Sequence, residues 1–575
     1  MAGADKLQEA IDDQRAGRLY AAAAKLESLV SFRPEAAVFE RLGFVRHSLG
    51  ELDAAATAFE SQCRLHPTSA AAESNLATIF GQMKRYDDAV RHYRRALLLD
   101  ADFVDARFNL AQVLELRNQI GQAIDAYRDV VARQPAHKLG WYRLGYLRFV
   151  GGFRVEAQDC YRRAIALDAE FVEARWALAM ATLPLAYDLG EQPAAFYAEF
   201  STRLTELDNW FANSHDGLGQ RAVGNQQPYY IVYHDRNNRD VLTRYGDLCA
   251  RLMRAWYGGH PVVATPHDDG PLNVTLVSGN VHDHAVWTAI VRGWCAHLDR
   301  SRFRLSIVYT DAVADAETEL ARSSVESFVS GTKPLTEWVD AIRNLAPDVL
   351  IYPEVGMDKM CIKLAGLRLA PVQVASWGHP ETTGMPDIDY FLSAEAFEPP
   401  NAQENYRERL VPLAGIGAHY GALAPARVDV DLHSLGLDPA LPVVLCPATP
   451  YKFLPAHDWT FAAIASGAGD CQFVFITDDL APHLSKQLAR RLRVAFEHAG
   501  LDPAHYVRFI GRQRRPEYFS LMRQSAVYLD TIVFSGFNTA MQAFECGLPV
   551  VTVEGRFLRS RFASGLLRQM GIDEL

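Results

Sequence analysis

The sequence predicts an α-helical repeat followed by two doubly wound α/β halves. Two observations lead to this prediction. The first third of the chain keeps a 34-residue period of small and aromatic residues, and from Leu272 onward short β-branched runs alternate with helical stretches. Because 575 residues are too many for one hydrophobic core, we expect roughly two to four domains.

The repeat is visible in three sets of positions that recur every 34 residues. These are the small residues Gly43, Ala77, Ala111, Gly145 and Ala179, the alanines Ala55, Ala89, Ala123 and Ala157, and the aromatic residues Phe59, Tyr93, Tyr127 and Tyr161. We expect each unit to form two amphipathic helices, with small residues where the helices touch and an aromatic ring between them. The pattern resembles the tetratricopeptide repeat, and residues 1–187 are expected to form an α-solenoid of such units.

A solenoid of this kind presents a concave face that binds extended peptides. We expect a protein or peptide partner on that face, and the alternative is an array that forms a homodimer or only stiffens the protein. Residues 188–270 are expected to be a helical joint. Within it the pattern predicts a polar linker at 214–227, a strand-like piece at Tyr229–Tyr233, a helix at 240–256 and a polar loop at 258–270.

The rest of the chain alternates strands with helices, which implies parallel sheets. The expected strands are 273–277, 304–309, 349–352, 373–375, 443–446, 472–476, 507–510, 527–530 and 550–553. Helices are expected at 285–297, 336–345, 459–465, 485–499 and 516–524. There are enough units for two Rossmann-like halves, 271–425 and 426–575. Two such halves facing a cleft form the sugar-nucleotide glycosyltransferase architecture called GT-B, and one large sheet is the alternative.

Composition argues against several classes of protein. The net charge is −11 and no basic run could track a phosphate backbone, so we expect no nucleic-acid partner. The eight cysteines are scattered without a C-x-x-C pair, which predicts neither a disulfide framework nor a zinc site and favours a reducing, cytoplasmic compartment. Residues 1–18 lack the apolar core of a signal peptide, and no apolar run reaches the roughly 18 residues of a spanning helix, so no membrane partner is expected.

The turn at 534–539 lies where a strand gives way to a helix N-terminus. Helix starts of this kind bind anions, because their first N–H groups lack helical partners and the helix dipole favours negative charge. Ser535 or Asn538 is expected to cap the helix, and Gly547 to end it. The residues alone leave two interpretations open: a nucleotide site at the carboxyl edge of the sheet, and an ordinary turn that binds nothing.

Three further segments carry side chains suited to chemistry at such a sheet edge. The turn at 277–285 places His284 near a helix N-terminus, and the loop at 376–386 offers hydroxyls and bare backbone. Lys452 lies in an apolar, proline-bounded loop, where a desolvated ammonium needs an anionic partner such as a diphosphate. Each has an ordinary alternative: a structural histidine, a tight structural loop, and a surface lysine whose stem is buried.

Four segments that follow the repeat resemble the protein O-linked N-acetylglucosamine transferases, most closely their bacterial relatives. They are the His284 turn, the loop at 378–384, the loop of Tyr451 and Lys452, and the turn at 535–539. With the repeat, the resemblance covers nearly the whole chain. It implies an inverting transfer of a sugar, usually from UDP-N-acetylglucosamine, to Ser or Thr hydroxyls of proteins, with neither a metal nor another cofactor.

The resemblance assigns the catalytic residues as His284, beside the acceptor, and Lys452, which contacts the donor diphosphate. Whether His284 is a base or only positions the acceptor stays open. The donor-binding residues are expected to be Pro380, Thr382, Thr383, Lys452, Ser535, Gly536, Asn538, Thr539, Gln542 and Glu545.

This sequence departs from the family pattern in the last turn and the helix after it. Phe537 stands where the family often has a histidine, and Gln542 stands where it has an acid that meets the ribose. Glu545 is the candidate substitute for that acid, because residues three apart share a helix face. Relatives continue with a further helical segment, so the end at Leu575 leaves a truncated copy as one interpretation.

Three functions therefore remain open at this stage. The first is the transferase described above. The second keeps the enzyme but changes the donor, to UDP-glucose or GDP-fucose, or the acceptor, to an asparagine or a small molecule. The third is a repeat adaptor whose transferase region binds partners without catalysis.

Overall fold

The structure, a computed structural model, describes residues 2–259, 270–478 and 481–572. It forms two compact units, residues 1–149 with 155–171 and residues 150–154 with 172–575, and each is treated by itself. Most of the polar loop expected at 258–270 lies outside the described residues, because 260–269 are not among them.

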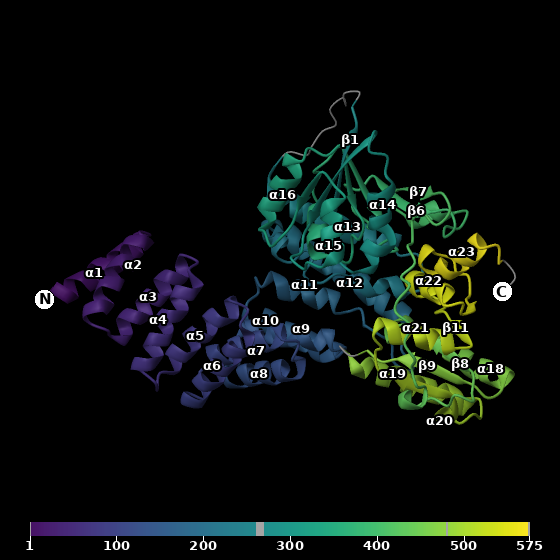
Figure 1. Cartoon of the computed structure of the whole chain (residues 1–575), viewed down its shortest axis with the longest axis horizontal. Coiled ribbons are helices and arrows are strands. Elements are labelled where there is room, and N and C mark those ends of the chain that lie inside the picture. The colour runs from purple at the N-terminus through teal and green to yellow at the C-terminus, as the bar shows by residue number, and fades with distance from the viewer. Residues whose placement is uncertain (1, 260–269, 479–480, 573–575) are drawn as a thin grey trace. The chain divides into compact units, whose positions relative to one another are not determined.

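The first unit is a row of helices joined by short turns (purple to blue in Figure 1), in which consecutive helices pack as pairs. The helices are α1 (Ala2–Arg15), α2 (Leu19–Phe32), α3 (Ala36–Ser48), α4 (Leu52–Leu65), α5 (Ala70–Gln82), α6 (Tyr86–Leu99), α7 (Val104–Leu116), α8 (Ile120–Arg133), α9 (Lys138–Val150) and α10 (Arg154–Leu167). The predicted helical repeat is therefore confirmed.

The small and aromatic positions of the 34-residue period meet inside these pairs. A Cβ atom on Gly43 would lie 2.6 Å from the Phe59 ring, and one on Gly145 would lie 2.7 Å from the Tyr161 ring. Both rings are buried, as is Ala111 at the equivalent small position. The period thus exists because each unit needs a small residue opposite a large ring.

The second unit begins with helices that lead into its sheets. They are α11 (Val172–Met180), α12 (Pro193–Ala212), the 3-10 helices η1 (Asp216–Arg221) and η2 (Tyr229–Tyr233), and α13 (Arg239–Tyr257). The segment expected to be a polar linker at 214–227 is packed rather than loose, since it contains η1 and the fully buried Ala222 and Val223.

The prediction of a strand-like piece at Tyr229–Tyr233 is wrong, because this segment forms the 3-10 helix η2. Its rings pack against side chains from the C-terminal part of the chain instead of joining a sheet. The ring centroid of Tyr233 lies 5.1 Å from that of Tyr451 and 4.9 Å from that of Phe534. A short aromatic run fits a strand and a packed 3-10 turn equally well, so the sequence pattern could not separate them.

Two separate parallel sheets follow, which confirms two α/β halves and excludes one large sheet for the described residues. The first sheet has the order β3-β2-β1-β4-β5-β6-β7 and the second β10-β9-β8-β11-β12. The strands are β1 (Leu272–Ser278), β2 (Phe303–Tyr309), β3 (Ser327–Val329), β4 (Val349–Tyr352), β5 (Val372–Ser376), β6 (Tyr390–Ala394), β7 (Arg409–Leu413), β8 (Val443–Cys446), β9 (Gln472–Ile476), β10 (Val507–Ile510), β11 (Val527–Leu529) and β12 (Val550–Val551).

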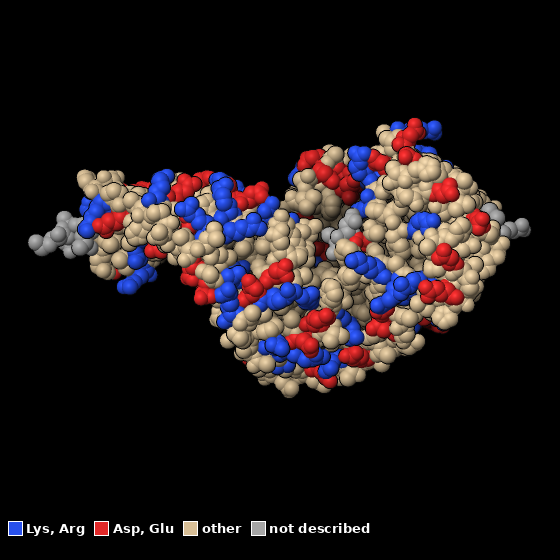
Figure 2. All heavy atoms as spheres, turned by 90° about the horizontal axis from the view of Figure 1, so that it is seen from below, with Lys and Arg blue, Asp and Glu red and all other residues tan. Residues whose placement is uncertain are grey.

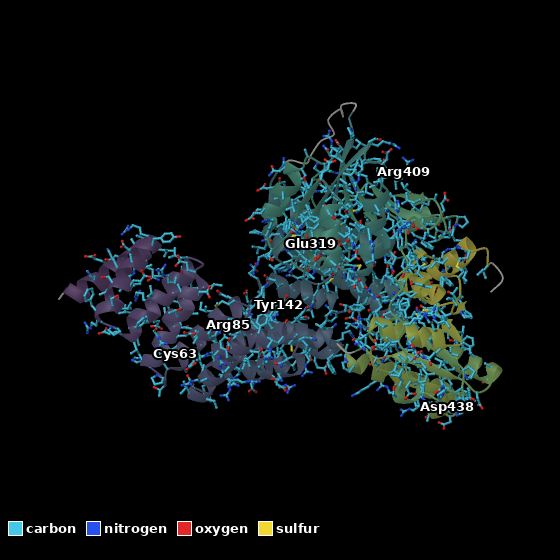
Figure 3. The ribbon with its side chains drawn as sticks, viewed as in Figure 1. Cys63, Arg85, Tyr142, Glu319, Arg409 and Asp438 are labelled. Carbon is cyan, nitrogen blue, oxygen red and sulfur yellow. The ribbon has the colours of Figure 1, made fainter. Side chains whose placement is uncertain are left out.

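The sequence did not predict β3, β6 and β7. The strand β3 has only three residues. The strand β7 begins at Arg409 (Figure 3) and contains Pro412, which an edge strand tolerates because its outer N–H has no ladder partner. The strand β6 lies inside the sheet, but its sequence Tyr-Phe-Leu-Ser-Ala contains no β-branched residue, which was the pattern used to predict strands.

Helices connect the strands of both sheets (Figure 1). In the first half they are the π-helix η3 (Trp287–Val291), α14 (Arg292–His297), α15 (Ala316–Ser323), α16 (Leu335–Asn344) and α17 (Lys359–Ala365). In the second half they are the 3-10 helix η6 (Pro450–Lys452), α18 (Trp459–Ala468), α19 (Pro482–His498), α20 (Pro503–Tyr506), α21 (Arg515–Gln524), α22 (Phe537–Glu545), the 3-10 helix η8 (Leu558–Ser560) and α23 (Phe562–Gln569).

The last described helix packs on the first half as well as on α22 of its own half. A Cβ atom on Gly565 of α23 would lie 2.4 Å from the carbonyl oxygen of Ala396, so the two backbones are in direct contact. Arg561 donates from Nε to the carbonyl of Phe397 at 2.9 Å. The first half, the joint helices and α23 therefore share one hydrophobic core.

All eight cysteines are free thiols, and six of them are buried. Cys63 on α4 (Figure 3) and Cys546 are half-buried. Burial raises the pKa of Cys63 to about 12 and also raises the pKa of Cys546. Within the described residues no three His, Cys, Asp or Glu side chains gather as metal ligands.

The surface mixes charges of both signs. On the face shown in Figure 2, Lys and Arg side chains are interspersed with Asp and Glu over both ends of the molecule. None of the described helices is both long enough and apolar enough to cross a lipid bilayer.

Substituting Gly246 tests how the joint is fixed to the first half. A Cβ atom at Gly246 in α13 would lie 2.1 Å from the carbonyl oxygen of Gly384, a backbone atom that cannot rotate away. We expect Gly246→Ala to lower the free energy of unfolding by about 3 kcal/mol, the upper range for overpacking. Calorimetry of the whole chain measures this as a lower melting temperature.

The matched control is Gly121→Ala in α8, where a Cβ atom would meet nothing within 4 Å. It removes a helical glycine in the same way and is expected to be neutral or to stabilise by up to about 1 kcal/mol. Equal melting temperatures for the two variants would contradict the close backbone contact.

Candidate functional site

The candidate turns lie at the switch point of each sheet. The strand order reverses between β1 and β4 in the first sheet, and between β8 and β11 in the second. In open parallel sheets, ligands bind outside the carboxyl ends of the strands at such a point. The His284 turn follows β1, the Lys452 loop follows β8 and the Ser535 turn follows β11. Local sequence patterns therefore found three segments that the topology places at the expected ligand edges.

A cavity of about 790 Å³ lies at the switch point of the second half. Its lining residues include Thr449 and Tyr451 after β8, Thr477 and Asp478 after β9, Arg512, Gln513, Arg514 and Arg515 after β10, and Thr539 and Gln542 of α22. The volume falls within the range of about 300–1,000 Å³ for small-molecule sites. Two predicted donor-binding residues, Thr539 and Gln542, thus line a cavity of suitable size.

A second, smaller cavity of about 90 Å³ is lined from both halves. His284 contributes from the first half, and Asn538 contributes from the second. Arg515 and Gln542 line this cavity and the larger one. The structure therefore brings His284 and Asn538 of α22 to one cavity.

An ion pair crosses between the halves beside this smaller cavity. Arg515 at the start of α21 donates from Nη2 to both carboxylate oxygens of Asp283 at 3.0 Å. Both side chains are about half exposed, at 48%, so screening by water leaves the pair worth little to stability. Its importance is geometric, because it holds a guanidinium at the rim of both cavities.

The imidazole of His284 is half-buried, and burial lowers its pKa, with His282 adding to the shift and Asp283 opposing it. Its Nδ1 accepts a hydrogen bond from the backbone N–H of Val286 at 3.2 Å. In the neutral ring this leaves the proton on Nε2, because one nitrogen accepts while the other donates. His284 is therefore a hydrogen-bond donor in this conformation.

Lys452 lies in the 3-10 turn η6, with its ammonium 4.4 Å from the centroid of the Phe534 ring. Burial lowers its pKa to about 8, and the negative charge of Asp530 opposes that shift. Lys452 forms no ion pair with any residue that the structure describes. It lines neither of the two cavities above but a third of about 160 Å³, whose lining mixes apolar side chains with polar ones that include Asp458 and Asp530.

The Ser535–Gly536 turn is held by a buried carboxylate instead of leaving its donors free. Ser535 donates from Oγ to Asp530 at 2.5 Å, and the Gly536 N–H donates to the same carboxylate at 3.0 Å. The expectation that Ser535 or Asn538 caps α22 is wrong, since Gly536 is the N-cap and no side chain caps the helix. The expected end at Gly547 is confirmed, since Gly547 takes a φ of +70° just after the helix.

Unlike Ser535 and Gly536, the first residues of α22 still have free N–H groups. The structure assigns no hydrogen-bond partner, among its described residues, to the backbone N–H groups of Phe537, Asn538 and Thr539. The buried Oδ1 of Asn538 also lacks one. The hydroxyl of Thr539 bonds that of Tyr528 at 2.8 Å. The N–H groups available to an anion are therefore those of residues 537–539, one to three positions after Gly536.

The structure directs Thr382 and Thr383 away from both cavities. Both are buried, and Thr382 donates from its hydroxyl to Glu408 at 2.6 Å, while the Thr383 N–H donates to Glu408 at 2.8 Å. Pro380 is also buried and lines no cavity above. These three donor-site residues stay predictions that this conformation does not bring beside His284.

Phe537, a departure from the family pattern, and Glu545, the candidate substitute for the missing acid, both have other partners. The Phe537 ring lies 4.9 Å from that of Trp377 and 5.9 Å from that of Phe397, so it belongs to an aromatic core. Glu545 accepts hydrogen bonds from the N–H groups of Leu423 at 3.2 Å and Ala424 at 2.5 Å. Gln542, not Glu545, lines the larger cavity.

Sequence reasoning missed two buried arginines that hold the segments around the site. Arg491 donates to both oxygens of Asp458 at 2.8 and 2.7 Å, and to the carbonyls of Phe453 and Tyr187 at 2.7 and 2.8 Å. Since Phe453 follows Lys452, Arg491 fixes the lysine loop. The available signal was an arginine among the buried leucines of α19, at a position that cannot reach water.

The second buried arginine, Arg559, joins the C-terminal segment to the first half. It pairs with Glu381 at 2.7 Å and donates to the carbonyls of His234 at 2.8 Å and Arg236 at 2.7 Å. Both side chains of the pair are almost fully buried, at 2% and 3% exposed. Arg559 thereby holds the loop of Pro380 and the joint in one place.

Proteins of known sequence extend these observations. Residues 75–138 match the family model described as tetratricopeptide repeat. The chain is 25% identical over 324 residues to the probable UDP-N-acetylglucosamine–peptide N-acetylglucosaminyltransferase SPINDLY of Solanum lycopersicum, covering 53% of this chain and 33% of that protein. It is 24% identical over 236 residues to the UDP-glucose:protein N-beta-glucosyltransferase of Actinobacillus pleuropneumoniae serotype 5b, covering 39% and 35%. The chain spans about a third of the length of these relatives.

Among solved structures, a mutant O-GlcNAc transferase of Thermobaculum terrenum matches with a TM-score of 0.61 and 22% identity, over 88% of this chain and 86% of that one. The chain resembles the O-GlcNAc transferases. The resemblance expected from the four segments is confirmed, and so is the fold, a tetratricopeptide solenoid with two Rossmann-like halves of the GT-B type. At this identity the likeness concerns the fold.

Replacing Arg491 tests the clamp on the Lys452 loop. Arg491→Met leaves the carboxylate of Asp458 buried without its partner, and such a loss costs about 3–5 kcal/mol of folding free energy. We expect the double variant Arg491→Met with Asp458→Leu to regain most of that loss, because no charge is then left unpaired. Urea unfolding followed by tryptophan fluorescence measures both, and an equally unstable double variant would contradict the role of the pair.

Proposed function

We propose that the chain is an inverting glycosyltransferase that moves a sugar from a nucleotide donor onto hydroxyls of protein substrates. One observation carries the proposal: the cavity of about 790 Å³ in the second half shares Arg515 and Gln542 with the cavity lined by His284. A nucleotide-sized space thus adjoins a histidine from the opposite half. A sugar attached to a diphosphate in the larger space would meet an acceptor beside His284.

The donor is proposed to be UDP-N-acetylglucosamine. The relatives named above are described as acting with UDP-N-acetylglucosamine on peptides and with UDP-glucose on proteins, so a uridine nucleotide is common to both names. Gln542 lines the nucleotide cavity where the family pattern has an acid. An amide can donate and accept hydrogen bonds with a ribose hydroxyl, so this change alters the contact without removing it.

The acceptor is proposed to be a protein held by the repeat array of residues 1–187. The match of residues 75–138 to the tetratricopeptide repeat supports this, because such arrays bind extended peptides. Both named relatives are described as acting on peptide or protein. The transferred sugar is proposed to join a Ser or Thr hydroxyl.

The charge that develops on the leaving diphosphate is proposed to be met by protein donors, without a metal ion. The N–H groups of Asn538 and Thr539 lie at the N-terminus of α22, where the helix dipole also favours an anion. The Lys452 ammonium, which has no counter-ion among the described residues, is the third donor, reached by rotation of its flexible side chain. A donor that the fold already holds in place, such as the N–H groups of Asn538 and Thr539, contributes about 3–4 kcal/mol to the barrier reduction.

His284 is proposed to position the acceptor by donating a hydrogen bond from Nε2. Its Nδ1 already accepts from the N–H of Val286, and a lowered pKa keeps the ring neutral. A neutral ring with its proton on Nε2 can hold the oxygen of an acceptor hydroxyl. As that oxygen bonds the sugar carbon, the diphosphate leaves with the electrons of the broken sugar–phosphate bond and takes up the hydroxyl proton. To act as a base, the ring would have to accept the proton at Nδ1, which already accepts the hydrogen bond from Val286.

Donor turnover with Lys452→Ala tests the enzymatic proposal. Purified protein is given UDP-N-acetylglucosamine, UDP-glucose and GDP-fucose side by side, and sugar release and binding are measured. We expect one uridine donor to be turned over, and Lys452→Ala to lose at least about 100-fold in turnover with an unchanged melting temperature. The control, Lys486→Ala on the exposed face of α19, should behave as the parent.

The outcome also separates the alternative functions. Preference for UDP-glucose or GDP-fucose would replace the proposed donor but keep the enzyme. Absence of binding of all three nucleotide sugars would overturn the proposal and leave a repeat adaptor.

The pH dependence of turnover tests the positioning role of His284. Because burial lowers the pKa of His284, we expect kcat to stay constant above the ordinary histidine pKa of about 6.5 and to fall only at lower pH, when the ring becomes charged. His284→Gln, whose amide still donates, should retain more activity than His284→Ala. A base would instead make the two variants equally poor.

A further inference from the structure

A fully buried carboxylate, that of Glu354, holds the turn that leads to His284. Glu354 lies just after β4 and is 0% exposed. Its Oε1 accepts hydrogen bonds from the Ser278 hydroxyl at 2.7 Å, the Gly279 N–H at 2.7 Å and the Asn280 amide at 3.3 Å. One oxygen thus fixes three consecutive residues at the carboxyl end of β1.

The other oxygen of the same carboxyl group has no partner. Glu354 Oε2 is buried and forms no hydrogen bond among the described residues. Two acidic groups face Glu354 from α17: the Asp358 carboxylate, and the Cys361 thiol at 3.9 Å from Oε1. Burial raises the pKa of Glu354 to about 7, and Asp358 adds to this, while the bonds from Ser278 and Gly279 oppose it. A neutral amide could accept the same hydrogen bonds without the cost of burying an ionisable carboxyl group.

The far end of the turn is anchored separately. Thr318 of α15 donates to the carbonyl of Val281 at 2.8 Å, and Asp315 accepts from the N–H of Asp283 at 2.8 Å. Both residues belong to the N-terminal cap of α15, and His282 Nδ1 in the middle of the turn lies 3.1 Å from the Tyr309 hydroxyl at the end of β2. Glu354 is therefore the group that ties the start of the His284 turn to the sheet edge.

The second half repeats the arrangement under its own turn. There Asp530 accepts from the hydroxyl of Ser535 and the N–H of Gly536, as Glu354 does from Ser278 and Gly279. Each turn is a Ser–Gly pair after a switch-point strand. The same solution on two separate sheets indicates that a carboxyl group under the turn belongs to the site.

We propose that Glu354 is a positioning residue of the transferase, which sets the place of His284 through the turn at 278–280. The inference rests on the proposed function, because it assigns His284 to the acceptor. Glu354 itself touches neither cavity lined by His284 or by Gln542. Its removal should therefore affect the step at His284 and spare donor binding in the other half.

The experiment compares Glu354→Gln with Glu354→Ala in the full chain, using the donor found to be turned over. The glutamine keeps an oxygen at the Oε1 position and should keep kcat within about threefold. The alanine should lower kcat about 100-fold, the loss expected for a misplaced catalytic group, with the donor KM changed less than about twofold.

The matched control is Glu398→Gln, a mostly buried acid of the same half that binds the hydroxyls of Ser393 and Tyr406 and does not touch the turn. It should leave kcat, KM and the pH profile of the parent unchanged. Equal losses in Glu354→Gln and Glu354→Ala, or a parallel rise in donor KM, would overturn the proposal.

A second readout does not depend on turnover. With 13C-labelled histidine, the ring signal of His284, assigned by its loss in His284→Ala, should shift in Glu354→Ala and stay near the parent position in Glu354→Gln. If the His284 signal stayed at the parent position in both Glu354 variants, the positioning role would be rejected even in an active enzyme. An inactive parent whose signal still moves in Glu354→Ala would instead reject only the proposed function.

Discussion

Two buried guanidinium groups determine how the site of this protein is assembled. Arg491 and Arg559 each pair with a buried carboxylate and also donate to backbone carbonyls. Arg491 donates to those of Tyr187 and Phe453, and Arg559 to those of His234 and Arg236 in the joint. A buried charge without its partners costs several kcal/mol, so each arginine admits one arrangement of the segments around it. Arg491 fixes the Lys452 loop against the residues that precede α12, and Arg559 fixes α23 against the first half. The joint is thus a structural part of the candidate site and not a spacer.

Buried acidic side chains also fix the turns at the two sheet edges. In each half one carboxyl group takes up the hydroxyl and the N–H of a Ser–Gly pair, and so decides which donors remain for a ligand. After Asp530 has engaged Ser535 and Gly536, the free donors of α22 are those of Phe537, Asn538 and Thr539. A side chain at position 536 would displace the Thr539 hydroxyl, because a Cβ atom at Gly536 would lie 2.1 Å from it.

Patterns that repeat along the chain could be predicted from it, and pairings between distant residues could not. The 34-residue period gave the solenoid, and alternating strands and helices gave two sheets with turns at their switch points. The partners of Thr382 and Arg491 lie up to 304 positions away, and no local pattern marks them. For the same reason Thr382 looked available to a donor when Glu408 already holds it. The aromatic run at Tyr229–Tyr233 looked like a strand because its packing partners were not yet known.

The eight free cysteines have a practical consequence for studying motion between the halves. Six are buried, and burial raises the pKa of the half-buried Cys63 and Cys546, so few thiolates are present near neutral pH. Maleimide dyes react with thiolates, and the parent protein should therefore stay largely unlabelled. A pair of exposed cysteines, introduced one in each half, could then carry fluorophores for energy transfer without removing a native thiol. Opening and closing of the cleft could be followed in single molecules of the otherwise unaltered chain.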